Sequence, residues 1–149
     1  MEVINTLSDP VIILGSLFLA KHIIADGPLQ FDYMAYGKTH IGHLGGFAHA
    51  ACHGVCTLIV LLIWLISGYV LSWEFIFKIV LLDMVIHYTV DICTGILPRK
   101  MAWTKRIEDK ETGKSHRLVT DRRFYWVLVV DQSIHFLTYL FLTILVLSA

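Results

Sequence analysis

The chain has 149 residues, of which 56% are hydrophobic and 16% charged, and its mean hydropathy is +0.69. Its formal net charge of zero gives no indication of a nucleic-acid partner, and we expect none. The composition lies far from that of soluble domains and predicts an integral membrane protein.

Four stretches approach the length of about 20 mostly apolar residues that a helix needs to cross a bilayer. They cover about 8–26, 47–71, 73–97 and 124–147. These helices nearly exhaust the chain. We therefore expect a single domain, residues 1–149, with an all-α fold: an integral membrane four-helix bundle.

The first stretch resembles a signal peptide in length, but its start, MEVINTLSDP, is acidic where a signal peptide is basic. We predict a mature helix here. Its apolar run ends at Lys21, whose amine we expect to extend toward the membrane surface.

Basic residues are concentrated between the last two predicted helices. Residues 98–123 hold nine of the twelve Lys and Arg residues and contain Thr112-Gly113, the predicted turn of a solvated hairpin. By the positive-inside rule this loop is cytoplasmic, which places both termini outside, in a bacterial inner membrane. Beyond topology, its flanking basic residues could attract anionic headgroups or a phosphorylated substrate: Arg99, Lys100, Arg122 and Arg123.

Ionisable residues recur in pairs within the apolar stretches, always four positions apart. Such spacing places both side chains on one face of a helix. The pairs are His22 and Asp26, His49 and His53, His87 and Asp91, and Asp131 and His135, with Asp83 one turn before His87.

An ionisable group in hydrocarbon costs roughly 2.5–3.5 kcal/mol on insertion scales, so these groups should face the bundle interior. Under the predicted topology all four pairs fall in the cytoplasmic half of the membrane. The charge distribution and the spacing therefore predict one cluster.

Imidazole and carboxylate groups on facing helices are how helical bundles build metal sites. The eight paired residues are the predicted ligands of one or two divalent transition-metal ions, zinc first, with iron or manganese as alternatives. A proton or ion relay, or a polar network that only fixes helix register, remains an alternative reading. Thr57 and Tyr139 extend the polar stripes and are predicted to support the ligands.

Four segments, AKHIIADGPLQ, HAACHG, IHYTVD and VVDQSIH, carry a resemblance across nearly the whole chain. The sequence resembles a bacterial and phage membrane family catalogued as domain of unknown function 3307. That family has no assigned activity. It more distantly resembles membrane-bound metal-dependent hydrolases, and this resemblance implies the same chemistry here.

We therefore expect a metal-dependent hydrolase that acts on a lipid or another membrane-accessible ester or phosphoester. Asp131 and Asp83 are the predicted catalytic residues, Asp83 either as a general base or as a group that supports the ligands. The alternatives are a proton- or ion-translocating protein and a non-enzymatic interaction protein of a phage or bacterium. The expected partners are the bilayer, a small-molecule or lipid substrate, and further copies of the chain in a homo-oligomer.

Overall fold

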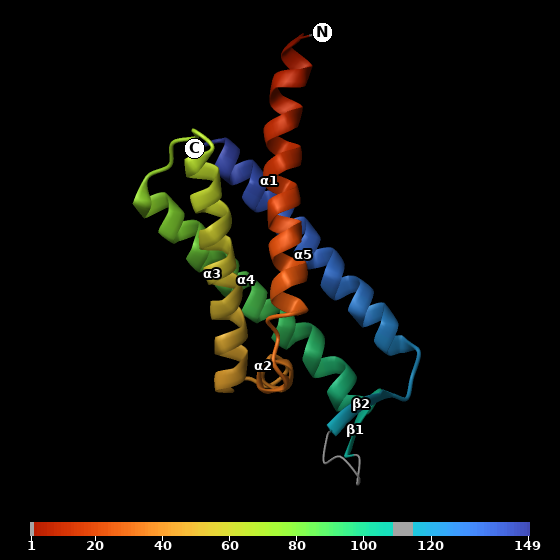
Figure 1. Cartoon of the computed structure of the whole chain (residues 1–149). Coiled ribbons are helices and arrows are strands. Elements are labelled where there is room, and N and C mark those ends of the chain that lie inside the picture. The colour runs from red at the N-terminus through yellow and green to blue at the C-terminus, as the bar shows by residue number, and fades with distance from the viewer. Residues whose placement is uncertain (1, 109–114) are drawn as a thin grey trace.

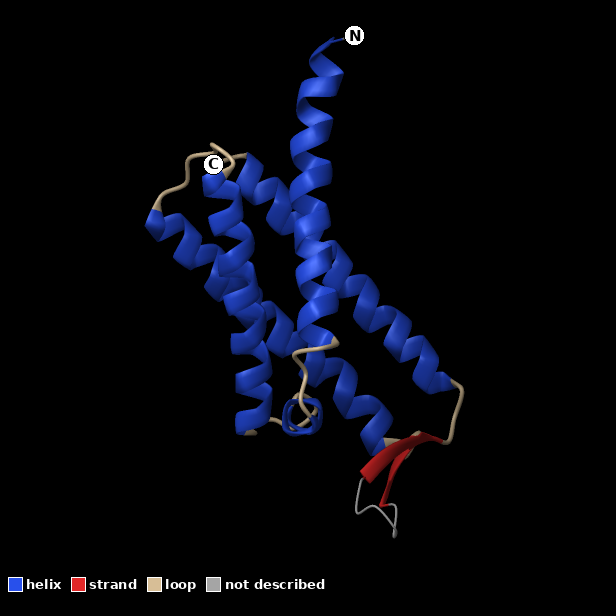
Figure 2. Ribbon diagram, in the orientation of Figure 1, coloured by secondary structure: helices blue, strands red, loops and turns tan. Residues whose placement is uncertain are grey.

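The computed structural model describes residues 2–108 and 115–149, and in these residues the chain is mostly helical (Figures 1 and 2). A single two-stranded antiparallel sheet is the only other regular structure described, which confirms the all-α class. In chain order the elements are α1 (Glu2–Asp26), α2 (Asp32–Gly37), α3 (Leu44–Ile66), α4 (Trp73–Lys100), β1 (Thr104–Glu108), β2 (Ser115–Val119) and α5 (Arg123–Leu147).

The four long helices pack into a bundle. Helix α3 contacts α1 and α4, and α5 contacts the same two helices. The two termini lie at one end of this bundle, whereas α2 and the β1–β2 hairpin lie at the other (Figure 1). The arrangement agrees with four successive passes of the chain from end to end.

Several predicted bounds need correction, beginning with helix α1, which starts at Glu2 rather than near residue 8. Helix α3 starts earlier, at Leu44, and stops at Ile66 rather than near 71, because Gly68 turns the chain with a φ of +95°. Helix α4 continues to Lys100, and a short helix, α2, occupies the first loop. The loop 98–123 contains β1 and β2, while the predicted turn at Thr112-Gly113 lies outside the described residues.

Two of the described helices, α3 and α5, are long and apolar enough to cross a membrane by length and composition, where the sequence predicted four. The two helices that pass also carry fewer charged residues than the two that do not. Helix α3 has no Asp, Glu, Lys or Arg, and α5 has two, but α1 has four and α4 has six.

The apolar core fills the half of the bundle nearer the termini. Leu14, Phe18, Leu61, Trp64 and Leu142 are among its buried members. Close van der Waals packing of such large apolar side chains stabilises the contacts between the helices. This core holds together the helices whose other ends carry the polar residues.

Lys21 does not extend to the surface as predicted. Its side chain is buried, and its Nζ lies 2.6 Å from Asp83 Oδ2. The expectation was wrong because a carboxylate of α4 lies within reach inside the bundle, and a paired charge is far less costly to bury than an unpaired one.

Candidate metal centre

All four predicted His/Asp pairs converge between α1, α3, α4 and α5. Each pair keeps its i, i+4 spacing on one helix face, so that the side chains of four helices meet at one level of the bundle. Five histidines and two aspartates within it are buried or nearly so: His22, His49, His53, His87 and His135, with Asp91 and the less deeply buried Asp131. The cluster predicted from spacing and topology is present in the fold.

Asp26 joins α1 to α3. Its Oδ1 lies 3.1 Å from His49 Nε2 and 3.7 Å from His53 Nε2, and its Oδ2 lies 3.2 Å from His22 Nε2. Lys38, which follows α2, reaches the same Oδ1 at 3.2 Å. One carboxylate therefore faces three imidazoles and one ammonium group.

Asp91 of α4 is a second carboxylate that faces three imidazoles. Its Oδ2 lies 3.3 Å from His49 Nε2 and 3.4 Å from His87 Nε2, and its Oδ1 lies 3.6 Å from His135 Nε2. His49 Nε2 and His87 Nε2 are themselves 3.2 Å apart. These three atoms of His49, His87 and Asp91 form a nearly equilateral triangle.

The triangle has the dimensions of a metal site. Ligands bound at about 2.0–2.2 Å in a tetrahedral arrangement lie roughly 3.3–3.6 Å from one another. Three ligand-type atoms of the cluster are buried with no hydrogen bond among the described residues: Asp91 Oδ2 of the triangle and, outside it, His53 Nε2 and His135 Nε2. A cation among them would give each of these atoms a partner, so the residues fit a metal ion.

Two groups of side chains could hold such an ion, with His87 common to both. In each group the ligand atoms lie within 4.8 Å of one another. The first is Asp26, His49, His53 and His87, and the second is His87, Asp91 and His135. Mixed nitrogen and oxygen donors of this kind suit zinc, iron or manganese.

His22 and Asp131, the other two predicted ligands, lie beside these groups. His22 Nε2 is 3.3 Å from Gln132 Oε1, and its Nδ1 is 3.1 Å from the Tyr139 hydroxyl. Asp131 Oδ1 accepts a hydrogen bond from Thr94 Oγ1 at 2.6 Å and lies 3.7 Å from His135 Nε2. His22 contacts Asp26 and Asp131 contacts His135, so each touches a member of the two groups. Of the two residues predicted to support ligands, Tyr139 contacts His22, and Thr57 contacts Asp83 instead of a member of either group.

Asp83 lies away from the clustered carboxylates. Its Oδ2 accepts hydrogen bonds from Lys21 Nζ and Thr57 Oγ1, both at 2.6 Å. Of the two roles predicted for Asp83, these contacts favour the supporting one, because the carboxylate links α1, α3 and α4 behind the cluster.

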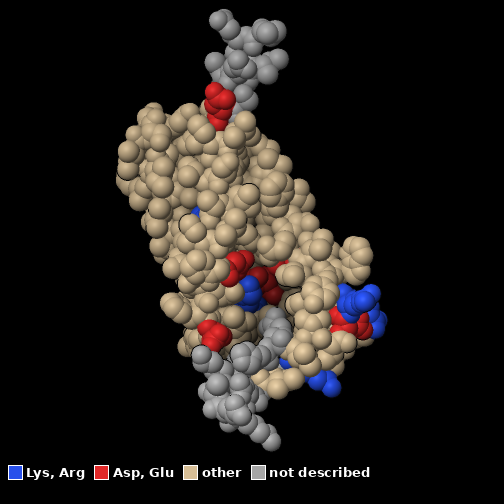
Figure 3. Space-filling view, turned by 45° about the vertical axis from the view of Figure 1, so that its right-hand side comes forward, with Lys and Arg blue, Asp and Glu red and all other residues tan. Residues whose placement is uncertain are grey.

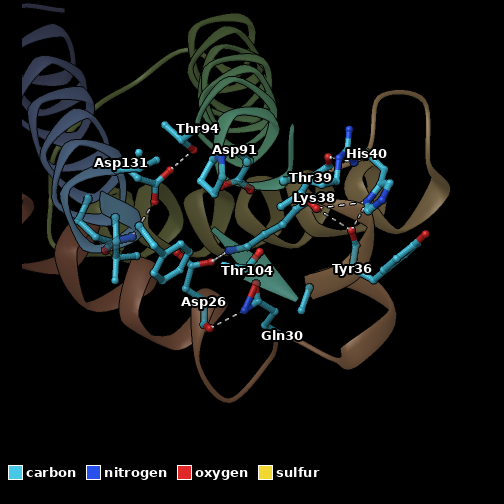
Figure 4. A pocket seen from close by; sticks show the side chains of 18 of the residues that line it. Asp26, Gln30, Tyr36, Lys38, Thr39, His40, Asp91, Thr94, Thr104 and Asp131 are labelled. Carbon is cyan, nitrogen blue, oxygen red and sulfur yellow. Dashed lines mark hydrogen bonds and ion pairs between the residues drawn. The ribbon is translucent and has the colours of Figure 1, made fainter. Parts of the chain in front are cut away.

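A pocket of about 770 Å³ adjoins the cluster and opens between the ends of α1, α4 and α5. Asp26, Asp91 and Asp131 line its inner side, and Lys38 reaches across it to Asp26 (Figure 4). In the space-filling view, acidic and basic atoms meet in a recess of an otherwise mostly uncharged face (Figure 3). The cluster is thus accessible from one side.

Three residues of the site were not predicted from the sequence. Thr94 and Gln132 both donate hydrogen bonds to Asp131, at 2.6 and 3.0 Å. Thr94 could have been found, since it follows Asp91 by three positions and shares its helix face. Lys38 could not be predicted as a site residue, because it lies in a loop, where residue spacing does not show which side chains share a face.

Comparison of the chain with family models, with curated proteins and with solved structures gives no match in any of the three.

Proposed function

We propose that the protein is an integral membrane four-helix bundle with both termini outside and the loop 98–123 in the cytoplasm. Support comes from the middle of the four long helices: the ionisable side chains of the cluster and of the Lys21–Asp83 pair lie inside the bundle, whereas large apolar side chains face outward. Leu137 and Ile144 on α5 are 60% and 56% exposed, and Ile63 on α3 is 42% exposed. Exposed apolar area on this scale needs a lipid or protein covering.

Within this bundle we propose a metal-dependent hydrolase that acts on a lipid or another membrane-accessible ester or phosphoester. Asp26, His49, His53, His87, Asp91 and His135 hold one or two ions, zinc first and iron or manganese as alternatives. A divalent ion at such a site supplies Lewis-acid polarisation of the bond to be cleaved and acidifies water.

The remaining polar residues have separate tasks. Asp131 lines the pocket, and its carboxylate is oriented by Thr94 and Gln132, so it is placed to take a proton from water entering the pocket. His22 keeps Asp26 in position. Lys38 offsets the charge of Asp26 at the pocket side. The closed, apolar end of the bundle excludes water from behind the cluster.

The observation that carries this proposal is the triangle of His49 Nε2, His87 Nε2 and Asp91 Oδ2, with sides of 3.2, 3.3 and 3.4 Å. Its test is the metal content of detergent-purified protein, measured by inductively coupled plasma mass spectrometry. We expect close to one or two equivalents of zinc, iron or manganese per chain, lost in a His87→Ala/His135→Ala variant.

A matched control is His40→Ala/His43→Ala, which removes two histidines outside both ligand groups and should keep its metal. Circular dichroism and gel filtration check that each variant folds. Because buried alanines can unfold the bundle, His87→Gln/His135→Gln serves as a second, larger replacement. A folded wild type that stays metal-free after incubation with all three metals overturns the proposal.

A proton or ion relay is the second candidate, and one set of contacts favours it. The Tyr139 hydroxyl lies 3.1 Å from His22 Nδ1, the Lys21 amine lies 4.4 Å from the Tyr139 ring centre, and Lys21 pairs with Asp83. Polar groups therefore continue from the cluster into the other half of the bundle. Proton flux into liposomes carrying the wild type, absent with the folded double variant Lys21→Met/Asp83→Asn, would favour this function over hydrolysis.

A further inference from the structure

We propose that the pocket beside the cluster binds a phosphate group of the substrate, with Arg99 and Lys105 as its anion ligands. This inference rests on the proposed function, because it assigns the substrate class of the same site. The shared chemistry is a phosphoester attached to an apolar group, either a phospholipid or a soluble phosphate ester.

The first argument is charge. Four carboxylates line the pocket, Asp26, Asp32, Asp91 and Asp131, and three cations face them, Lys38, Arg99 and Lys105. With the histidines neutral, the lining therefore carries one excess negative charge. One divalent ion reverses that sign and a second increases the positive charge further, so that the loaded pocket attracts an anion.

The second argument is that two of these cations are uncommitted. Lys38 is paired with Asp26 at 3.2 Å. Arg99 and Lys105 are exposed and make no ion pair among the described residues. Arg99 Nη1 donates to the Thr39 carbonyl at 2.5 Å, which holds the guanidinium at the pocket while its other N–H groups stay available. Such a planar group binds phosphate oxygens in pairs.

The third argument is the position of Thr39, which depends on close packing against α4. A Cβ added at Gly95 would lie 2.5 Å from Thr39 Cγ2 and 3.1 Å from its Cα. Only glycine allows this approach without a shift of the loop. The loop in turn places Lys38 over Asp26 and the Thr39 carbonyl against Arg99, as Figure 4 shows for the labelled members.

The fourth argument is the division of the pocket into a charged rim and apolar walls. Arg99 and Lys105 are exposed, whereas Asp91 at the inner side is buried. Ile23 of α1 and Phe124, Val127 and Leu128 of α5 line the pocket as well. A phosphate at the rim therefore has apolar walls for the group attached to it and faces the cluster on its inner side.

The test compares two double variants with the same change in net charge. Arg99→Gln/Lys105→Gln removes the proposed anion ligands. Lys100→Gln/Arg122→Gln removes two neighbouring cations that do not line the pocket. The probe is phosphatidic acid with a fluorescent acyl chain, titrated with zinc-loaded protein in detergent micelles and followed by anisotropy. Diacylglycerol with the same label is the phosphate-free control.

We expect the wild type to bind labelled phosphatidic acid at least about tenfold more tightly than labelled diacylglycerol, and the Arg99/Lys105 variant to lose that preference. The Lys100/Arg122 variant should stay within about twofold of the wild type. Competition by unlabelled glycerol 3-phosphate at similar concentrations assigns the site to soluble phosphate esters. Lack of competition assigns it to phospholipids, and both outcomes support a phosphate site.

Equal binding of the two lipids, or an equal loss in both double variants, overturns the phosphate site. Zinc content is measured on the same samples. A zinc-loaded protein without phosphate preference overturns this inference alone, whereas a protein that holds no zinc, iron or manganese overturns the proposed function itself.

Discussion

Lys21 and Asp83 form an ion pair inside the bundle, with Nζ and Oδ2 2.6 Å apart and side chains only 3% and 1% exposed. The pair joins α1 to α4, and Thr57 adds a hydrogen bond from α3 to the same oxygen. Helices α1, α3 and α4 thus meet at one carboxylate, directly behind the His/Asp cluster.

Loss of one partner of this pair should destabilise the fold strongly. Lys21→Met leaves the Asp83 charge buried without its counter-ion, and breaking buried pairs in this way costs about 3–5 kcal/mol. The double variant Lys21→Met/Asp83→Asn should recover most of that loss. Denaturant titration in detergent, followed by circular dichroism, measures both. Equal destabilisation of the single and double variants would show that packing, not charge, is responsible.

The exposed pair Lys78–Glu74 gives the matched comparison. It has the same 2.6 Å distance, but the side chains are 68% and 78% exposed. Glu74→Gln should leave the unfolding midpoint unchanged, because exposed pairs contribute little.

Removal of metal should lower stability. An ion that binds the folded chain and not the unfolded one adds about 4 kcal/mol when its free concentration is a thousandfold above Kd. A chelator should therefore lower the melting temperature of the wild type, and added zinc should restore it. The His87→Gln/His135→Gln variant should respond to neither. A wild-type melting temperature that does not change with chelator contradicts the metal site.

Thr94 should tune metal affinity through Asp131. Its hydroxyl donates to Asp131 Oδ1 at 2.6 Å, so Thr94→Val removes the group that orients this carboxylate. Asp131 is itself an outer partner of the proposed ligand His135, 3.7 Å from its Nε2. Loss of an outer partner of a ligand typically weakens metal binding about 10–100-fold, so loosening Asp131 through Thr94 should weaken it by less than about tenfold. Competition with a chromogenic chelator measures the change.

Thr89→Val is the control for this substitution. The Thr89 hydroxyl bonds only the Val85 carbonyl of its own helix, so metal affinity should stay as in the wild type. The same loss in both valine variants would mean that the effect comes from helix α4 as a whole.

Gly95→Ala should displace the loop after α2. The added methyl group would overlap Thr39, and overpacking of this kind costs about 1–3 kcal/mol. Gly15→Ala is the control, because its Cβ meets only Thr143 Oγ1 at 3.8 Å and should be tolerated. Thermal unfolding compares the two. If the variants are equally stable, the Thr39 loop moves without cost and does not hold Arg99.

The termini should be accessible from outside the cell and the hairpin from inside. Single cysteines at Ser148 and Thr120, in a chain whose three native cysteines are replaced, report this directly; both positions are exposed. A membrane-impermeant maleimide should label Ser148→Cys in intact cells and Thr120→Cys only after permeabilisation. Labelling in the reverse order contradicts the positive-inside assignment.

Hydropathy and i, i+4 spacing were sufficient to predict the four long helices and the residues that cluster between them. Both are local properties: an apolar run predicts a helix, and a fixed spacing puts His87 and Asp91 on one face whatever surrounds them. The prediction that Lys21 extends to the membrane surface failed because it was also based on a local property. Hydropathy shows that a lysine is charged, but it does not show that the Asp83 carboxylate lies opposite it in the fold.

Only the tertiary structure decided which of the clustered groups meet. Asp26 and Asp91 are 65 positions apart in the chain, yet both lie within 3.3 Å of His49 Nε2, whereas Asp131 is held by Thr94. The pocket is lined in part by Lys38, Thr39 and Arg99. These residues lie in a loop and at the end of α4, where the sequence has no periodic pattern from which the pocket could be predicted. Distances between side chains depend on how helices pack, and packing depends on contacts between residues far apart in the sequence.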